Sequence, residues 1–275
     1  MDQRFIPYKK STVAYRRSGR GSRVMLCFHG YGENAASFDF LSRYAGEEFL
    51  FLAIDLPFHG QTHWEEGLSI HPSDLSAIIQ LLFEQESVPF HEPEFRYTLA
   101  GYSLGGRICL SLYQQQPAMV DKLLLLAPDG LKVNAWYWLA TQTHAGNRFF
   151  AFTMKKPYWF FGVLKLMNRF GLINSSIFKF VNYYIGDPQV RKELYNRWTT
   201  LRYFKPDIKT IRQQVREHNT AVRLLYGIHD RIIKADTGKK FITGIEQQSG
   251  LQEIHSGHML LHEKHVKEIL PALLH

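Results

Sequence analysis

The fold of this chain is decided by Phe95-Arg96-Tyr97-Thr98-Leu99-Ala100-Gly101-Tyr102-Ser103-Leu104-Gly105-Gly106-Arg107. An apolar run rich in β-forming residues leads into a Gly-x-Ser-x-Gly pentapeptide, and a helix-compatible run follows, so the pattern predicts a strand, a sharp turn and a helix. In such a turn Ser103 takes a strained conformation that projects its hydroxyl from the top of the sheet, and a side chain at Gly101 or Gly105 would collide. Gly106 lets the helix lie close to the sheet. Because the pentapeptide also arises by chance, its context has to support it.

Apolar strands alternate with helices over most of the remaining chain. Further buried strands are predicted at 23–28, 49–54 and 122–127, another strand at 221–226 and a short strand at 251–255. Helices are predicted from His258 onward and at 36–48, 75–86, 104–116 and 235–248, and an antiparallel hairpin is predicted at 4–17. Nearly continuous apolar strands are typical of parallel sheets that are buried on both faces. The alternation therefore predicts an α/β fold with a mostly parallel sheet, in which sites lie at the carboxyl ends of the strands.

One segment, residues 131–216, differs in composition from the rest. It carries 15 Lys and Arg against 3 Asp and Glu, a balance of +12, whereas the remainder of the chain has 18 basic and 22 acidic residues. It also holds 19 of the 39 aromatic residues. Helical patches are expected at 158–170 and 188–204. Because the segment interrupts the alternation of strands and helices, we interpret it as an insertion.

The 275 residues, of which 45% are hydrophobic, suffice for one large domain with an insertion. The first ten residues do not resemble a signal peptide, and no run approaches about 18 uncharged apolar residues, so we expect a cytoplasmic protein. Two cysteines are too few for a disulfide framework. Cys27 lies in a predicted strand and Cys109 on the helix after the serine turn, so both are expected to be small buried apolar residues.

The chain also supplies the partners that a nucleophilic serine needs. A serine hydroxyl is a poor nucleophile near neutral pH, so a base must take its proton and a carboxylate must orient that base. His258 follows the last predicted strand, and Asp230 follows the strand before it. Asp129, after the strand at 122–127, is an alternative carboxylate. The chain order Ser103, Asp230, His258 differs from the orders found in chymotrypsin-like and subtilisin-like enzymes.

With these residues the chain resembles the α/β-hydrolase superfamily, in its serine-nucleophile, lid-containing, carboxylesterase-like form. The matching residues are His29-Gly30, Asp55-Leu56-Pro57 with His59-Gly60, Gly101-Tyr102-Ser103-Leu104-Gly105-Gly106, Gly227-x-x-Asp230 and Gly257-His258. The resemblance implies an eight-stranded sheet formed by residues 1–130 and 217–275, with a helical lid formed by residues 131–216. It also implies an oxyanion hole made by the backbone N–H groups of Tyr31 and Leu104.

The resemblance implies a serine hydrolase that cleaves a carboxylic ester or thioester through an acyl-enzyme intermediate. Ser103 would be the nucleophile, His258 the general base and then acid, and Asp230 the carboxylate that holds the imidazole. The serine excludes relatives that attack with aspartate, the haloalkane dehalogenases and epoxide hydrolases. An acyltransferase, a carbon–carbon bond hydrolase or a lyase of the same fold uses the same residues. A non-catalytic binding protein that kept the fold is the remaining alternative.

One loop departs from the family pattern. In residues 55–62, Phe58 stands where a glycine is commoner and Thr62 where a serine is usual. The loop borders the site without supplying chemistry, so the departure concerns substrate shape more than mechanism. His29 and His59 are interpreted as residues that brace loops, not as proton carriers.

No metal or other cofactor is expected. The histidines at 255, 258, 262 and 265 include an i, i+4 pair, but no suitably spaced carboxylate or cysteine completes a metal site. The expected partner is a small acyl ester or thioester, and no nucleic acid is expected. Because cations and aromatics occur together in residues 131–216, we expect an apolar acyl pocket rimmed by positive charge. Such a pocket suits an acyl group on an anionic carrier, or weak association with an anionic surface.

Overall fold

The computed structural model describes residues 2–132, 135–170 and 185–274. Its contacts divide the chain into two compact units. The first unit comprises Met1–Glu66, His71–Lys132 and Phe204–His275, and the second comprises Gly67–Ile70 and Val133–Tyr203. Most of the second unit thus comes from the predicted insertion, but the unit ends before residue 216. Residues 204–216 belong to the first unit.

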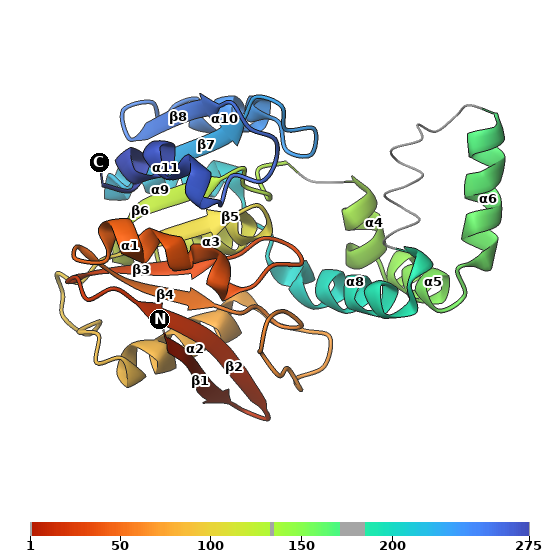
Figure 1. Cartoon of the computed structure of the whole chain (residues 1–275), viewed down its shortest axis with the longest axis horizontal. Coiled ribbons are helices and arrows are strands. Elements are labelled where there is room, and N and C mark those ends of the chain that lie inside the picture. The colour runs from red at the N-terminus through yellow and green to blue at the C-terminus, as the bar shows by residue number, and fades with distance from the viewer. Residues whose placement is uncertain (1, 133–134, 171–184, 275) are drawn as a thin grey trace. The chain divides into compact units, whose positions relative to one another are not determined.

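The first unit contains an eight-stranded sheet (Figure 1). In chain order the strands are β1 (Asp2–Tyr8), β2 (Ser11–Ser18), β3 (Arg23–Phe28), β4 (Phe49–Ile54), β5 (Tyr97–Tyr102), β6 (Val120–Leu126), β7 (Ala221–Gly227) and β8 (Ser249–Ile254). Their order across the sheet is β1-β2-β4-β3-β5-β6-β7-β8. Strand β2 is antiparallel to both β1 and β4, and all other neighbouring strands are parallel. The predicted mostly parallel sheet is therefore confirmed.

Strand β5 lies between β3 and β6, where Gly101 pairs with Phe28 on one side and with Leu125 on the other. All residues of β4 and β5 are buried, as their continuous apolar runs predicted. Because β3, β5, β6, β7 and β8 run in the same direction, the loops that follow them meet at one edge of the sheet. These loops carry Tyr31, Ser103, Asp129, Asp230 and His258.

Helices accompany the sheet on both faces. They are α1 (Ser42–Ala45), α2 (Pro72–Gln85), α3 (Leu104–Gln115), α9 (Ile208–His218), α10 (Ala235–Ile242) and α11 (Val266–Leu274), with short 3-10 helices at Ala35–Leu41, Pro117–Met119 and Glu263–His265. Helix α3 packs against both α2 and α9. Helices α1 and α11 lie on the near face of the sheet in Figure 1. The helices on both faces explain why the central strands are apolar along their whole length.

The predicted helix from His258 onward is wrong at its start. Helix α11 begins later, after a single 3-10 turn. The imidazole of His262 accepts a hydrogen bond from the backbone N–H of Lys264 (3.1 Å) and so caps that turn. His258 therefore stays in the loop after β8. The helix predicted at 235–248 also ends early, because the chain turns at Gly244, whose φ is +87°.

The described part of residues 135–203 in the second unit is helical. Its described elements are α4 (Ala135–Gln142), α5 (His144–Lys155), α6 (Tyr158–Arg169), α8 (Pro188–Thr200) and a 3-10 helix, Leu201–Tyr203. The indole of Trp198 on α8 contacts the rings of Tyr137 on α4 and Phe150 on α5, at centroid distances of 5.2 Å and 5.6 Å. These rings join three helices into one small core. Helices α6 and α8 match the predicted helical patches, whereas α4 and α5 were not predicted.

Three glycines at the serine turn allow α3 to approach the sheet. A methyl group at Gly105 would lie 1.8 Å from the carbonyl oxygen of Phe28, and one at Gly101 would lie 2.5 Å from the carbonyl oxygen of Gly105. At Gly106 it would lie 2.4 Å from the side chain of Pro128. The first two contacts are with main-chain atoms, which cannot move aside as a flexible side chain can. The predicted close approach is therefore present.

Gly105→Ala is expected to lower the free energy of unfolding by about 3 kcal/mol or more, because the added methyl overpacks against backbone that no rotamer change relieves. Gly162→Ala is the matched control, since Gly162 lies within α6 and its added methyl meets no atom within 4 Å. Alanine there is expected to stabilise the helix by about 0.5–1 kcal/mol. Urea unfolding followed by circular dichroism measures both changes. Equal effects of the two substitutions would contradict the close packing at Gly105.

Candidate active site

Ser103 has a backbone conformation that side chains rarely adopt, with φ of +49° and ψ of −112°. Its N–H donates to the carbonyl of Leu126 (2.9 Å), and its carbonyl accepts from the N–H groups of Gly106 (2.9 Å) and Asp129 (2.8 Å). Such conformations cost about 1–3 kcal/mol and persist only where the surroundings enforce them. These three hydrogen bonds hold Ser103 at the turn between β5 and α3.

The structure brings the side chains of Ser103, His258 and Asp230 into one hydrogen-bonded row. Nε2 of His258 lies 3.0 Å from Oγ of Ser103, and Nδ1 lies 2.7 Å from Oδ2 of Asp230. An ionised carboxylate only accepts hydrogen bonds, so Nδ1 carries a proton and Nε2 of the neutral imidazole is left to accept one from the serine hydroxyl. The row thus has the geometry of a nucleophile, a base and a carboxylate that orients the base.

The carboxylate of Asp230 is held by the backbone of its own loop. Its side chain is 0% exposed. Its second oxygen, Oδ1, accepts hydrogen bonds from the N–H groups of Ile232 (2.7 Å) and Ile233 (2.9 Å). These bonds fix the carboxylate and leave Oδ2 directed at His258.

The alternative carboxylate, Asp129, has a different partner. One of its oxygens accepts a hydrogen bond from the guanidinium of Arg107 on α3, and the other accepts from the N–H of Gly130 (2.7 Å). The side chain of Arg107 is almost fully buried, so Asp129 balances a charge inside the fold. Of the two candidate carboxylates, Asp230 is the one that hydrogen-bonds to His258.

Two residues at the site were not predicted from the sequence. The hydroxyl of Tyr102 donates to the backbone carbonyl of His258 (3.0 Å), and the centroids of the two rings lie 5.5 Å apart. Burial raises the pKa of the Glu33 carboxyl, and hydrogen bonds from Ser37 and Gly30 and the positive charge of a protonated His258 oppose this. A Cβ at Gly30 would lie 2.8 Å from the Tyr102 ring. Tyr102 occupies an unspecified position of the pentapeptide and Glu33 lies outside every motif, so no local pattern marks them.

The predicted oxyanion donors, Tyr31 and Leu104, follow two neighbouring strands, β3 and β5. Leu104 is the first residue of α3, and the first N–H groups of a helix have no carbonyl partner within that helix. They also carry the positive end of the helix dipole. Tyr31 comes directly after His29-Gly30. Tyr31, in a loop, and Leu104, at the start of a helix, therefore both follow strands at the edge of the sheet that carries Ser103.

The two histidines interpreted as braces are buried in these loops. Nε2 of His29 accepts a hydrogen bond from the N–H of Leu56 (3.1 Å), so its Nδ1 donates to the carbonyl of Gly30 (2.8 Å). Nδ1 of His59 lies 3.0 Å from a carbonyl oxygen of its own loop. Phe58 has a φ of +62°, which accounts for the preference for glycine at that position. Within the parts of the chain that the structure describes, no three His, Cys, Asp or Glu side chains are placed to hold a metal ion.

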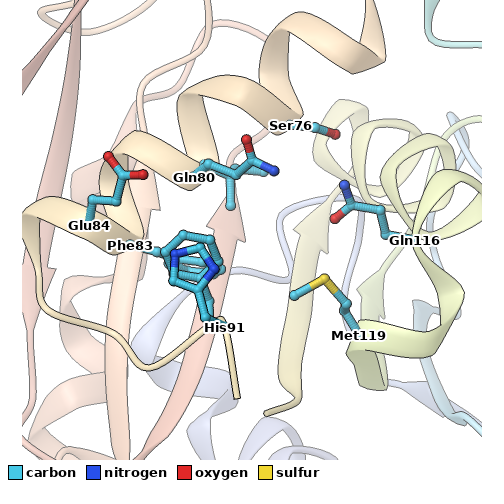
Figure 2. Close-up of a pocket in the computed structure, with 9 residues that line it drawn as sticks. Ser76, Gln80, Phe83, Glu84, His91, Gln116 and Met119 are labelled. Atoms are coloured by element: carbon cyan, nitrogen blue, oxygen red, sulfur yellow. The ribbon is translucent and has the colours of Figure 1, made fainter. Parts of the chain in front are cut away.

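A cavity of about 310 Å³ opens elsewhere on the first unit (Figure 2). Helix α2 lines it with Gln80 and Phe83, and the turn before β6 lines it with Gln116 and Met119. His91 lies beside Phe83 in the same view. Residues that precede β6 lie at the amino end of that strand, whereas the serine and its partners follow carboxyl ends. The cavity is therefore not part of the hydrogen-bonded row.

Comparison with known proteins identifies the family. A family model described as serine aminopeptidase, S33, matches residues 20–265, which is most of the chain. The chain belongs to this α/β-hydrolase family. The superfamily and the general class of hydrolase that the sequence predicted are thereby confirmed.

Individual proteins that resemble this α/β-hydrolase agree with the family assignment. It is 23% identical over 251 residues to the uncharacterized hydrolase YugF of Bacillus subtilis, a match that covers 91% of this chain and 88% of that protein. A probable hydrolytic enzyme from Pseudomonas aeruginosa has a TM-score of 0.69 at 17% identity and covers 100% of this chain and 94% of its own. A thermophilic esterase from Thermogutta terrifontis has a TM-score of 0.67 at 14% identity, with 98% and 96% covered. At these identities the solved structures show the fold alone.

Glu33→Gln tests the buried carboxyl of the α/β-hydrolase. Because burial raises the pKa of Glu33 in the folded state, the folded protein holds that proton more tightly than the unfolded chain does. The charged form therefore lowers stability above the pKa of an exposed glutamate, about 4.3, and this loss disappears as the pH falls. Glu33→Gln is expected to raise the Tm at pH 7 by about 2–4 °C for each kcal/mol recovered, and to raise it much less at pH 4. Glu94→Gln, at an exposed glutamate, is the control. If Glu33→Gln raises the Tm equally at pH 7 and at pH 4, a destabilising buried charge at Glu33 is contradicted.

Proposed function

We propose that this α/β-hydrolase is a serine hydrolase that cleaves a carboxylic ester or thioester through an acyl-enzyme. One observation carries the proposal: the hydrogen-bonded row from Asp230 through His258 to a serine at a strained turn. An imidazole nitrogen that faces the hydroxyl of Ser103 supplies the base that a serine nucleophile needs. The buried carboxylate accepts the proton of Nδ1, so it fixes the tautomer of the neutral imidazole in which Nε2 faces the serine, and it holds the ring in that orientation.

In the first half-reaction Oγ of Ser103 attacks the acyl carbon while Nε2 of His258 takes the hydroxyl proton. The oxyanion of the tetrahedral intermediate accepts hydrogen bonds from the N–H groups of Leu104 and Tyr31, next to the positive end of α3. The imidazolium then returns its proton to the leaving alkoxide or thiolate, and the acyl group stays on Ser103. Asp230 stabilises the imidazolium during this step.

In the second half-reaction a water molecule attacks the acyl carbon of the ester on Ser103. His258 takes a proton from the water and passes it to Oγ as the carboxylic acid leaves. The free serine and the neutral imidazole are then restored. If an alcohol or amine replaced water in this step, the same residues would transfer the acyl group. Quantifying the free acid formed therefore separates hydrolysis from transfer.

The ester or thioester class is supported by the fold neighbours. The Thermogutta terrifontis structure is that of an esterase, and a thioesterase domain from the curacin biosynthetic pathway has a TM-score of 0.62. The family description names an aminopeptidase, so amide hydrolysis is the second candidate. We expect kcat/KM for p-nitrophenyl butyrate to exceed that for an aminoacyl p-nitroanilide by at least about 100-fold, because an ester has the better leaving group. The reverse preference assigns the protein to amide substrates.

Ser103→Ala is expected to reduce kcat for a p-nitrophenyl ester by roughly 10⁶, the loss found when the nucleophile is removed from a comparable site. It should also abolish labelling by a fluorophosphonate, which reacts with an activated serine. The Tm should change little, because one hydroxyl is lost and no packing. Ser76→Ala on α2 is the control and should keep both activity and labelling. If the kcat of Ser103→Ala is within a few-fold of that of the unaltered protein, the proposal is contradicted.

Asp230→Asn is expected to lower kcat by roughly 10⁴, because an amide leaves the imidazole of His258 in the wrong tautomer. Asp129→Asn should leave kcat within a few-fold. It should instead lower the free energy of unfolding by about 1–3 kcal/mol, because the buried Arg107 loses its charged partner. Measuring kcat and unfolding side by side separates the two roles. If Asp129→Asn lowers kcat more than Asp230→Asn does, the carboxylate that orients His258 is Asp129.

A further inference from the structure

Exposed apolar side chains are concentrated on α4, α5 and α6 of the second unit. Among the described residues, 16 large hydrophobic side chains are exposed, and 10 of them lie between Trp136 and Phe170. The other six lie on the first unit, and three of these are in the loops after β7 and β8 that carry Asp230 and His258. Soluble proteins rarely expose large contiguous apolar patches unless the patch binds something.

Four exposed apolar side chains, three on α6 and one directly after it, form a stripe. Trp159, Val163, Leu166 and Phe170 recur at i, i+4, i+7 and i+11, so at 3.6 residues per turn they fall within an arc of about 60°. Leu166 is 56% exposed and Phe170 is 67% exposed. Leu164, on the other side of α6, is buried. Such a stripe normally packs against a partner, but among the residues that the structure describes Val163, Leu166 and Phe170 remain exposed.

Helix α5 continues this stripe. The ring of Phe149 lies 5.1 Å from that of Trp159, and both side chains are exposed. Phe152, one turn further along α5, is exposed as well. The apolar surface thus runs across two helices, which are labelled in Figure 1.

The charges beside this surface have one sign. Residues 135–170 contain five Lys and Arg and no Asp or Glu. All five cations are exposed, and no described carboxylate forms an ion pair with any of them. On α6 the cations Lys165 and Arg169 are one turn apart. At 3.6 residues per turn, they lie roughly 100° around the helix axis from the stripe. The partner must therefore be apolar and negatively charged at once.

We propose that the α5–α6 face binds the surface of an anionic lipid membrane. This face is defined by Phe149, Phe152, Trp159, Val163, Leu166 and Phe170, with the neighbouring cations. Helices with aromatic and aliphatic residues on one side and Lys or Arg beside them lie in the lipid interface, where the apolar side enters the acyl region and the cations meet anionic headgroups. None of the described helices is long and apolar enough to cross a bilayer, so the contact is with the surface.

Two other partners fit the face less well. A second copy of the chain would bring ten cations together with no acid in the same segment to balance them. A nucleic acid would meet the cations and stack on the rings, but the aliphatic Val163 and Leu166 in the middle of the stripe offer nothing for bases to stack on. Lipid acyl chains fit all four residues of the stripe.

The role of this contact in catalysis rests on the proposed function. A hydrolase held at a lipid surface takes its acyl substrate from that surface. Membrane binding itself does not use Ser103, so Ser103→Ala should bind vesicles as the unaltered protein does. A failure of binding and a failure of the catalytic proposal can therefore be told apart.

The test is sedimentation of the full chain with phosphatidylcholine vesicles, with and without phosphatidylglycerol. We expect binding to the anionic vesicles, and binding should weaken as salt shortens the Debye length from about 10 Å at 0.1 M to about 3 Å at 1 M. Lys165→Gln with Arg169→Gln should lower the partition coefficient about 30-fold at low salt, because each cation near an anionic surface contributes a factor of about five. Leu166→Ser with Phe170→Ser should lower it about tenfold or more, since these side chains no longer enter the acyl region.

The matched controls lie on the first unit. Lys10→Gln with Lys240→Gln removes two exposed cations there, and Phe5→Ser with Leu81→Ser removes two exposed apolar residues. Both controls should bind anionic vesicles as the unaltered protein does. The proposal is overturned if the protein does not sediment with anionic vesicles, or if the α6 variants and the controls bind alike. It is also overturned if Phe170→Ser dissociates a dimer without changing vesicle binding, or if a single-stranded oligonucleotide binds the face and the vesicles do not.

Discussion

The left-handed backbone of Ser103 is the constraint on which the rest of the structure depends. Its φ of +49° turns the chain sharply between β5 and α3, and α3 packs against both β5 and β3. Gly101 and Gly105 make that approach possible. Hydrogen bonds to Leu126 and Asp129 tie the turn to β6 and to the loop after it. The direction of the hydroxyl is therefore set by the fold, before a substrate binds.

The other members of the row depend on the parallel sheet. Asp230 and His258 lie on loops after β7 and β8. These strands are parallel to β5 and are separated from it in the sheet by β6, so their positions relative to β5 are fixed by the sheet. Each loop then adds a local restraint. The backbone of Ile232 and Ile233 fixes the carboxylate, and the hydroxyl of Tyr102 holds the carbonyl of the histidine itself. The main chain of His258 is thus held by Tyr102 and its ring by Asp230, which favours one orientation towards the serine.

The strands and the serine turn could be predicted because their signals are local: continuous apolar runs and glycines at fixed spacing. Asp230 was predicted as the carboxylate, but Asp129 stayed open as an alternative, because both follow strands and the sequence does not say that Arg107 pairs with Asp129. Tyr102 and Glu33 were missed for a related reason, since their roles arise from contacts between distant segments. Helices α4 and α5 were missed, and several of their aromatic side chains are exposed, so these residues do not mark a buried face.

Strands β6 and β7 are neighbours in the sheet, yet residues 127–220 separate them in the chain. Their pairing closes a long loop, at an entropic cost that grows with the logarithm of its length. During synthesis the strand and helix on either side of Ser103 emerge first. The loops with Asp230 and His258 emerge only after the whole second unit has left the ribosome. A nascent or truncated chain therefore carries Ser103 without the imidazole of His258, and the hydrogen-bonded row forms only when the last two strands join the sheet.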